Sequence, residues 1–292
     1  STDRERRFVR KAFGQYLAPQ LLSELEKAPD RMVLGGELRP LTIMFMDVRD
    51  FTPISEAISA TELVQFLNTL LSPLSDAIQA EGGTIDKYIG DSIMAFWNAP
   101  LDVADHAAKA CAASLAMRAI LSEMNAADAF GFRGRGRDDL VVKIGIGLNT
   151  GEACVGNMGS QRRFNYSAVG DAVNISARIE SASKSFGTDI LVSEDTAFAA
   201  PGFAMLEVDE VLLKGKAKPV KLFALYGDKA TAATPAFAAL RADHERMMDA
   251  LRAGRIEEAA ALAARCRDAA DPWFRSLYDK FMDRCQAPAA QH

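Results

Sequence analysis

The sequence is poor in the side chains that most often bind zinc. It contains three histidines, His106, His244 and His292, and four scattered cysteines, Cys111, Cys154, Cys266 and Cys285. No two cysteines form a C-x-x-C pair, so we expect reduced thiols in a cytosolic compartment. With so few histidines, a histidine-based zinc site is not expected. A metal ion in this protein would be held by carboxylates, which favours a hard ion such as Mg²⁺.

The chain also lacks long apolar runs and an excess of basic residues. No stretch of 18 apolar residues occurs, so no transmembrane helix is predicted, and no signal peptide is recognisable. The net charge of −5 argues against a general nucleic-acid binder, because phosphate binding needs a basic surface. We therefore expect a cytoplasmic location. The charged, helix-like start STDRERRFVRKAFGQYLAP suggests a fragment of a longer protein, with a natural polar N-terminus as the alternative.

Three segments differ in their patterns. Residues 1–36 carry a helical pattern interrupted at Pro19, which is typical of a linker or coupling helix. Residues 37–228 alternate short strands, which come as hairpins, with amphipathic helices. This order predicts an α+β domain with a mostly antiparallel sheet. Residues 229–292 are Ala-rich and predict three helices that resemble a single tetratricopeptide-like unit, which must pack on the main domain or on a partner.

Within the central segment, the expected elements follow from periodicity and turn residues. We expect a strand at 40–47, a helix at about 60–81, a hairpin that turns at Gly90-Asp91, and a helix at about 103–126 with Asp102 as its N-cap. Strands are expected at 140–149 and 152–157, with a helix from about 171 to 185. The Gly- and Arg-rich segment 127–139 is expected to be a solvated loop, with phosphate contact as the less favoured alternative.

Two aspartates stand out, because a buried carboxylate is costly unless it is paired. Asp47 follows the apolar run LTIMFM, and Asp91 lies on the predicted hairpin turn. If the two strands are neighbours, both carboxylates lie at one edge of the sheet, and two Mg²⁺ ions would relieve their repulsion. The alternative for either residue alone is an ordinary N-cap or turn residue. Backbone N–H groups of residues 48–52 could form a concave cradle for phosphate.

Four separated motifs resemble the class III nucleotide cyclase catalytic domain. They are FMDVRDFT, DKYIGDSIMAFW, GIGLNTGEACVGNMGS and YSAVGDAVNISARIE, in the family's order and spacing over residues 38–226. The segment 10–36 is similar to the helical coupling element of bacterial membrane-bound receptors. The resemblance implies the ferredoxin-like, palm-like cyclase fold and a homodimer with two equivalent shared sites. It also implies the cytoplasmic part of a receptor cyclase, with an N-terminal membrane sensor module in the full-length protein.

The resemblance further implies an adenylate cyclase, which converts ATP to 3′,5′-cyclic AMP and pyrophosphate with two Mg²⁺ or Mn²⁺ ions per site. The metal-binding positions are matched by Asp47, Asp91 and the backbone of Val48. The base-reading positions are matched by Lys87 and Ser167. Asn174 matches the asparagine that orients the ribose, and Arg178 matches the arginine that stabilises the pentavalent phosphorus. The phosphate-contacting positions are matched by Arg162, Lys214 and the cradle residues Asp50, Phe51 and Thr52; the Asp50 side chain itself is expected to be a turn residue rather than a metal ligand.

The choice between adenine and guanine depends on two side chains. Lys87 only donates hydrogen bonds, which suits the N1 acceptor of adenine, whereas guanine-specific relatives usually carry a glutamate there. Ser167 stands where animal adenylyl members have an aspartate, and its hydroxyl can both accept and donate, so some use of GTP is expected. A guanylate or dual-specificity cyclase is therefore the main alternative. A non-catalytic nucleotide-binding module is disfavoured because Asp47, Asp91 and Arg178 are all present, and a diguanylate cyclase because EGGTIDKYIGD lacks the G-G-D/E-E-F signature.

Overall fold

The computed structural model describes residues 2–14, 17, 19–27, 36–160, 164–212 and 217–287. Its strands are β1 (Glu37–Arg49), β2 (Thr84–Ile89), β3 (Ser92–Trp97), β4 (Lys143–Gly159), β5 (Phe164–Val169), β6 (Ile190–Ser193), β7 (Ala204–Val211) and β8 (Val220–Gly227). Within the described ranges, these eight strands form one sheet in the order β2-β3-β1-β4-β6-β8-β7, with β5 paired to β4 outside this series. Strands β4 and β6 run parallel and the other pairs run antiparallel, which confirms the predicted mostly antiparallel α+β fold.

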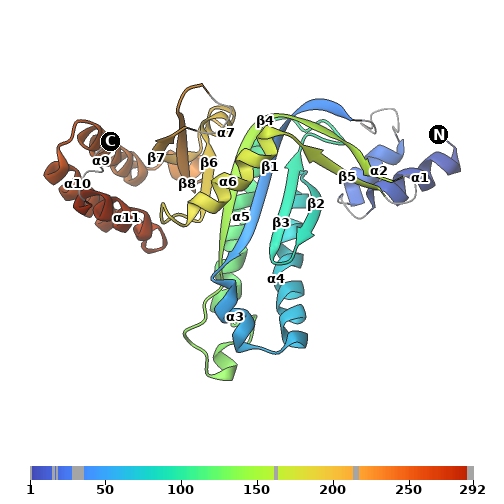
Figure 1. Cartoon of the computed structure of the whole chain (residues 1–292), viewed down its shortest axis with the longest axis horizontal. Helices are drawn as coiled ribbons and strands as arrows, with labels where there is room; N and C mark the ends of the chain where they lie inside the picture. The colour runs from blue at the N-terminus through green and yellow to red at the C-terminus, as the bar shows by residue number, and fades with distance from the viewer. Residues whose placement is uncertain are drawn as a thin grey trace.

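The helices lie on both faces of the sheet and at its two ends. They are α1 (Asp3–Phe13), α2 (Pro19–Lys27), α3 (Phe51–Ala57), α4 (Ala60–Ala80), α5 (His106–Ala126), α6 (Asp171–Ser183), α7 (Glu194–Ala199), α8 (Lys229–Ala232), α9 (Pro235–Arg252), α10 (Ile256–Ala269) and α11 (Arg275–Gln286). Short 3₁₀ helices occupy Arg133–Arg135 and Pro272–Phe274. Figure 1 shows α1 and α2 beside β5 at one end and α9 to α11 at the other.

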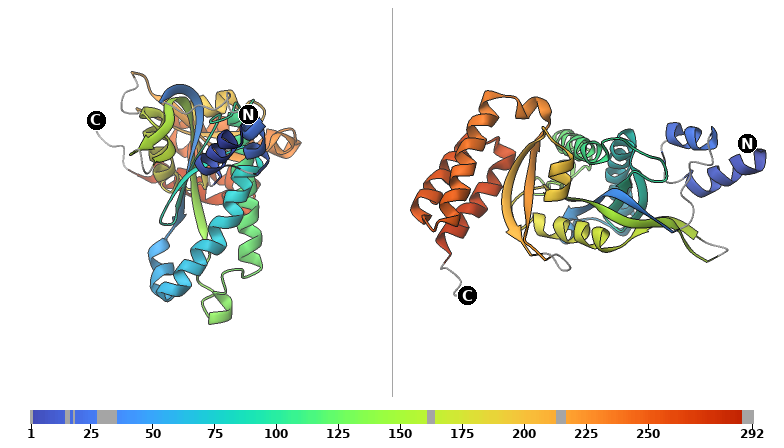
Figure 2. Two further views of the ribbon diagram at one scale, coloured as in Figure 1. Left: turned by 90° about the vertical axis from the view of Figure 1, so that its right-hand side faces the viewer. Right: turned by 90° about the horizontal axis from the view of Figure 1, so that it is seen from above.

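The two faces of β1 belong to different hydrophobic clusters. Met44 and Met46 pack with α4 and α5 on one face, whereas Leu41 and Ile43 point to the opposite face. This division follows from the two-residue period of a strand, in which successive side chains alternate between faces. Helix α6 covers the second face, and Ser176 of α6 donates a hydrogen bond to the backbone oxygen of Ile43 at 2.8 Å. Figure 2 shows α5 and α6 on opposite sides of the strands.

Close packing between α6 and β4 requires a glycine at position 147. A Cβ atom added at Gly147 would lie 2.3 Å from the backbone nitrogen of Glu180 in α6, a distance that real Cβ atoms essentially never show. The motif GIG therefore lets a helix rest directly on the strand backbone. This contact fixes the height of α6 above the sheet, and α6 carries two of the predicted site residues.

Some predicted boundaries were wrong for identifiable reasons. The expected strands at 140–149 and 152–157 are one continuous strand, β4, which pairs with β1 over residues 37–49. Helix α5 begins at His106 with Asp105 as the N-cap residue, so Asp102 is not its cap. Asp102 forms an ion pair with Arg39 instead. The short helices α3 and α7 were not predicted, since seven or six residues carry little periodic signal.

The N-terminal and C-terminal helices both pack on the sheet domain. In α1, Phe13 is fully buried and meets Tyr166 of β5 edge to face, with 5.0 Å between ring centroids. The C-terminal helices share a hydrophobic cluster with β7 and β8 that includes Leu206, Tyr226 and Phe237. These contacts agree with the expectation that the C-terminal helices pack on the main domain or on a partner. No helix in the described ranges is long and apolar enough to cross a membrane.

Polar contacts fasten the C-terminal helices to β7. His244 Nε2 lies 2.6 Å from the backbone oxygen of Glu207, and since a carbonyl only accepts, Nε2 carries the hydrogen. His244 Nδ1 then accepts from the hydroxyl of Tyr278 at 3.0 Å. Arg284 donates to the backbone oxygen of Val208 at 2.9 Å. Burial lowers the pKa of His244 to about 4, so this imidazole is neutral at neutral pH.

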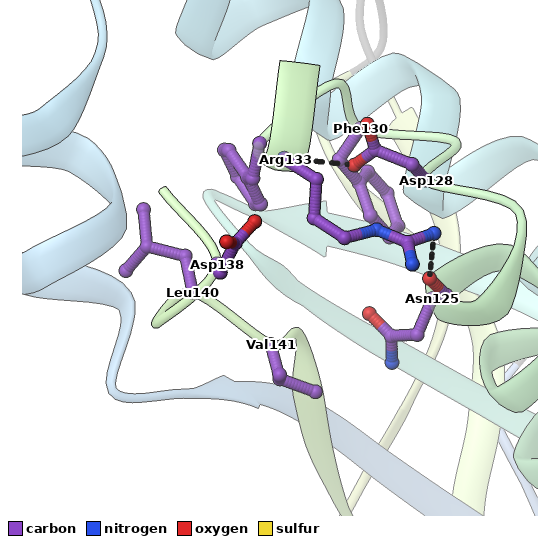
Figure 3. A pocket seen from close by; sticks show the side chains of 8 residues that line it. Asn125, Asp128, Phe130, Arg133, Asp138, Leu140 and Val141 are labelled. Carbon is purple, nitrogen blue, oxygen red and sulfur yellow. Dashed lines mark hydrogen bonds between the residues drawn. The ribbon is translucent and has the colours of Figure 1, made fainter. Parts of the chain in front are cut away.

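The Arg-rich segment after α5 is held by hydrogen bonds and ion pairs to other parts of the chain. Asp128 accepts from the backbone N–H of Arg133 at 3.1 Å, and Figure 3 shows these two residues beside Asn125 in a small pocket. The arginine side chains of the segment are each paired within the chain. Arg133 donates to the backbone oxygen of Ala126, Arg135 pairs with Glu62, and Arg137 pairs with Asp139. These pairings support the expectation of a surface loop over the alternative of a phosphate site.

Candidate active site

Strand pairing brings Asp47 and Asp91 together. In the β1–β3 pair, Met46 lies opposite Ile93, so Asp47 lies next to the turn that joins β2 to β3. Gly90 has a φ of +59° at that turn, a left-handed conformation that glycine adopts at little cost. Ser92, the first residue of β3, donates from Oγ to Asp47 Oδ1 at 2.8 Å. Both carboxylates are therefore held at one edge of the sheet, as the sequence predicted.

The two carboxylates repel each other in the absence of a cation. Burial, and then contact with Asp47, raise the pKa of Asp91 to about 6, while backbone N–H groups of Asp91 and Val48 lower it. Glu180 of α6 belongs to the same acidic region. Burial, and then Asp47 and Asp91, raise its pKa to about 7, against the opposing effect of Arg49. In the described part of the chain, no ion pair joins Asp47 or Asp91 to a basic side chain.

Two carboxylates suit an ion such as Mg²⁺ that also takes ligands from water and substrate, and they are too few to enclose a metal ion with protein side chains alone. Mg²⁺ commonly binds through one or two carboxylates and takes its other ligands from water and substrate phosphates. Asp47 and Asp91 supply such a pair, and their mutual repulsion favours a cation between them. No group of three or more His, Cys, Asp or Glu side chains that could hold a metal occurs among the residues described. The ion would therefore complete its ligand set with water or with oxygens of a phosphate-bearing substrate.

The predicted phosphate cradle lies where β1 passes into α3. Val48 is buried within β1, and Asp50 adopts a left-handed conformation, with a φ of +50°, immediately before Phe51 and Thr52 open the helix. The Asp50 side chain caps no N–H group of α3 and instead pairs with Lys184 at 2.7 Å. Asp50 is thus a turn residue, and the first-turn N–H groups of α3 have no side-chain cap. Arg162 and Lys214 lie outside the residues that the structure describes.

The two predicted base-reading residues are linked by a third side chain. Ser167 is buried in β5 and donates from Oγ to Asp86 Oδ2 at 2.6 Å. Lys87 is exposed on β2, and its Nζ lies 3.8 Å from Asp86 Oδ1. Burial raises the pKa of Asp86, while the contacts with Ser167 and Lys87 lower it. Lys87 and Ser167 therefore lie on either side of one buried carboxylate.

Asn174 and Arg178 are both exposed on α6, four residues apart and so on one face of the helix. No side-chain hydrogen bond or ion pair joins either of them to another described residue. The same helix carries Glu180 beside the two aspartates. Helix α6 thus presents two polar side chains outward while its buried face rests on β4 and β1.

Residues 36–227 match the family described as the adenylate and guanylate cyclase catalytic domain. The chain belongs to this family. An adenylate cyclase from Anabaena cylindrica is 34% identical to this chain over 224 residues, which cover 74% of this chain and 41% of that protein. The chain thus spans less than half the length of this relative. The family match confirms the resemblance that the four motifs predicted.

Solved cyclase structures share the fold. The guanylyl cyclase Cya2 is 36% identical, with a TM-score of 0.59, over 67% of this chain and 95% of that chain. The adenylyl cyclase CyaB from P. aeruginosa is 30% identical, with a TM-score of 0.56, over 66% of this chain and 96% of that chain. The two are named for different nucleotides, so structural likeness alone does not choose the base for this cyclase domain.

Sequence reasoning missed three residues of this cyclase domain. Asp86 lies in the strand TIDKYI, where the cost of burying a carboxylate, the same reasoning that drew attention to Asp47, could have found it. Glu180 ends the motif that contains Asn174, but its approach to Asp47 depends on how α6 rests on β4. Ser92 directly follows Asp91, and nothing in the sequence pairs it with Asp47.

Proposed function

We propose that this chain is the catalytic part of an adenylate cyclase, which converts ATP to 3′,5′-cyclic AMP and pyrophosphate at sites shared by two copies. The observation that carries the proposal is the Asp47–Asp91 pair, two adjacent carboxylates at the end of neighbouring strands with no basic side chain paired to them among the described residues. An ordinary turn or cap role would not hold two carboxylates against each other at a cost in stability.

In the proposed reaction, the 3′-hydroxyl of ATP loses its proton to water and its oxygen forms a bond to the α-phosphorus. The bond from that phosphorus to the bridging oxygen breaks, and pyrophosphate leaves. Two Mg²⁺ or Mn²⁺ ions at Asp47, Asp91 and the backbone of Val48 would supply charge neutralisation for the attacking oxygen and the phosphates. Asn174 orients the ribose, and Arg178 stabilises the negative charge that develops on the phosphorane oxygens. The N–H groups of Asp50, Phe51 and Thr52, with Arg162 and Lys214, hold the remaining phosphates.

The sites are proposed to be shared because Asn174 and Arg178 are exposed and available to a second molecule. Complementation tests this directly. An Asp47→Ala chain and an Arg178→Ala chain should each be inactive, but their mixture should recover about a quarter of the wild-type rate, because half of the dimers are mixed and each has one intact site. The matched control mixes Arg178→Ala with Asn174→Ala. No mixed dimer then has an intact site, so activity should stay absent.

The complementation test is interpreted only if wild-type protein is active under the same conditions. If the Asp47→Ala and Arg178→Ala mixture stays inactive while dimers form, the sites are not shared between copies. Cyclic nucleotide production should also be followed against protein concentration, with ATP and GTP and with each metal. A rate per chain that rises with concentration supports an active dimer, whereas formation of neither product would refute the cyclase proposal.

Adenine is the proposed base because Lys87 can donate to its N1 atom. A guanylate or dual-specificity cyclase is the second candidate, favoured by the 36% identity to a protein named guanylyl cyclase. The double change Lys87→Glu and Ser167→Cys should shift preference from ATP toward GTP, since glutamate accepts from the N–H groups of guanine. A double variant that stays active and ATP-selective would contradict the base assignment.

The N-terminal helices are proposed to couple a sensor module, in a membrane-bound receptor, to the catalytic domain. The coupling role is supported by the contact between Phe13 of α1 and Tyr166, because Tyr166 is next to the base-reading Ser167 in β5. Removal of residues 1–27 should therefore change the rate of cyclic nucleotide formation. An unchanged rate and an unchanged dimer would argue against a coupling role.

A further inference from the structure

Asp86 is a buried carboxylate that contacts both base-reading side chains. Its side chain has no exposed surface, Oδ2 accepts from Ser167 at 2.6 Å, and Oδ1 lies 3.8 Å from Lys87 Nζ. Oδ1 is buried without a hydrogen-bond partner in the described structure. A buried carboxylate with one unpaired oxygen costs stability, because that oxygen has lost its water without gaining a hydrogen-bond donor. Packing alone therefore does not account for Asp86.

The contact with Asp86 determines which way the Ser167 hydroxyl points. A serine hydroxyl has one hydrogen to donate and two lone pairs that accept. The separation of 2.6 Å is typical of a hydroxyl that donates to a carboxylate. Once its hydrogen is directed to Asp86, Ser167 can offer a bound base only an acceptor.

We propose that Asp86 is a positioning residue that sets the base preference of the site by holding the Ser167 hydroxyl in its acceptor orientation. This inference rests on the proposed nucleotide cyclase function. Adenine presents an amino group at position 6, which donates to such an acceptor. Guanine presents an oxygen at position 6, so two acceptors would face each other without a hydrogen between them. A hydroxyl that was free to turn would accept either base, whereas a tethered one favours adenine.

Asp86 also constrains Lys87, although more loosely. The Lys87 side chain is half exposed and its ammonium group lies too far from Oδ1 for a direct hydrogen bond, so its hydrogens remain available to the N1 atom of adenine. The same carboxylate thus leaves a donor at Lys87 and an acceptor at Ser167. That pairing matches the N1 and amino edge of adenine and opposes the O6 and N1–H edge of guanine.

The test compares selectivity in Asp86→Asn with wild-type protein. The amide nitrogen of the variant can donate to Ser167 Oγ, which frees the hydroxyl hydrogen for the base. The ratio of kcat/KM for ATP to kcat/KM for GTP should fall about tenfold, because loss of one oriented hydrogen bond changes discrimination by roughly that factor. Asp86→Leu, which has similar branching and no polar atoms, is the second variant. It removes the carboxylate acceptor and leaves the Ser167 hydroxyl hydrogen free to turn toward a bound base, so the ratio should fall several-fold.

The matched control repeats Asp86→Asn in a Ser167→Ala background. Without the hydroxyl, Asp86→Asn should leave the ratio unchanged within about twofold, because the two residues act through one contact. A purely structural role of Asp86 would lower activity with both nucleotides and leave the ratio alone. Thermal unfolding and dimer content of each variant are measured alongside to separate selectivity from loss of folded protein.

Several results would overturn the inference. They are an unchanged ratio in folded Asp86→Asn and Asp86→Leu proteins, or an equal fall of the ratio in the Ser167→Ala background. Binding of 3′-deoxy-ATP and 3′-deoxy-GTP, which cannot cyclise, is measured in parallel by calorimetry. If wild-type protein forms no cyclic product, the cyclase proposal fails. The ratio of the two dissociation constants in wild type and variants still decides whether Asp86 selects the base.

Discussion

Replacement of Asp91 by asparagine should stabilise the metal-free protein while removing its activity. In the folded chain the pKa of Asp91 is raised from 3.8 to about 6, by burial and by Asp47. Between these pH values the folded state binds more protons than the unfolded state, so wild-type protein loses stability as the pH rises through this window. Asparagine carries no charge and avoids this loss. The advantage of Asp91→Asn should be absent near pH 4 and complete above about pH 6.

The size of the effect follows from the same pKa. A rise from 3.8 to about 6 corresponds to about 3 kcal/mol for a fully buried group, and partial exposure of Asp91 reduces this to roughly 1–2 kcal/mol. In a domain of this size, each kcal/mol shifts the unfolding temperature by about 2–4 °C. Cyclase activity should fall by about 100-fold or more, because one of the two metal-binding carboxylates is gone.

The assay is thermal unfolding in a chelating buffer at pH 4 and pH 8, followed by the same scans with Mn²⁺. Wild-type protein should gain more stability from Mn²⁺ than the variant does, since only it keeps both carboxylates. Asp76→Asn, an exposed change on α4, is the matched control and should show no pH-dependent gain. The reasoning is refuted if Asp91→Asn is less stable than wild type at pH 8 without metal, or equally stabilised at both pH values.

Other predictions concern packing and the C-terminal helices. Burial lowers the pKa of His244 to about 4, so this residue contributes stability that is lost as the pH drops from 6.5 to 4. Because Asp91 and Glu180 act in the opposite direction over this range, the test is the difference in urea unfolding between wild type and His244→Gln, which should move against wild type by up to about 3 kcal/mol from pH 6.5 to pH 4. Gly147→Ala should cost more than about 2 kcal/mol and impair catalysis, because the new methyl group meets Glu180, whereas Gly134→Ala, whose nearest atom lies at 3.8 Å, should change stability by less than about 0.5 kcal/mol in the same urea assay. Truncation after Asp228 should expose the apolar cluster under α9 to α11 and cause dye binding and aggregation; a monodisperse, fully active truncated chain would contradict a structural role for these helices.

The paired aspartates could be predicted from the sequence because their positions depend on local rules. A strand that carries Asp47 near its end and a hairpin that turns at Asp91 need only one further condition, that the strands be neighbours, and the β1–β3 pairing meets it. Local rules failed where a distant residue changed the outcome. Aspartate is a residue type that often caps a helix, but Asp102 forms an ion pair with Arg39 of β1. The helix starts later, after Asp105.

The contacts that tune the site were not predictable in the same way. Ser167 and Asp86 lie on strands β5 and β2, which are far apart in the sequence and do not pair with each other, so no periodicity indicates their hydrogen bond. Glu180 approaches the aspartates only because Gly147 lets α6 rest directly on β4. The residue types at the site were thus readable from motifs, whereas their hydrogen-bond directions and charges required three-dimensional packing.

The contacts around β7 bear on how copies of this chain associate. β7 is an outermost strand of the sheet, and such a strand exposes backbone groups that can recruit another chain into a continuous ladder. Here the strand is irregular between Glu207 and Asp209, and His244 and Arg284 occupy two of its carbonyl oxygens. The C-terminal helices therefore make it harder for β7 to pair with a strand of another chain and so to start open-ended polymerisation. For an enzyme proposed to work as a homodimer, this protection of β7 favours a dimer over filaments.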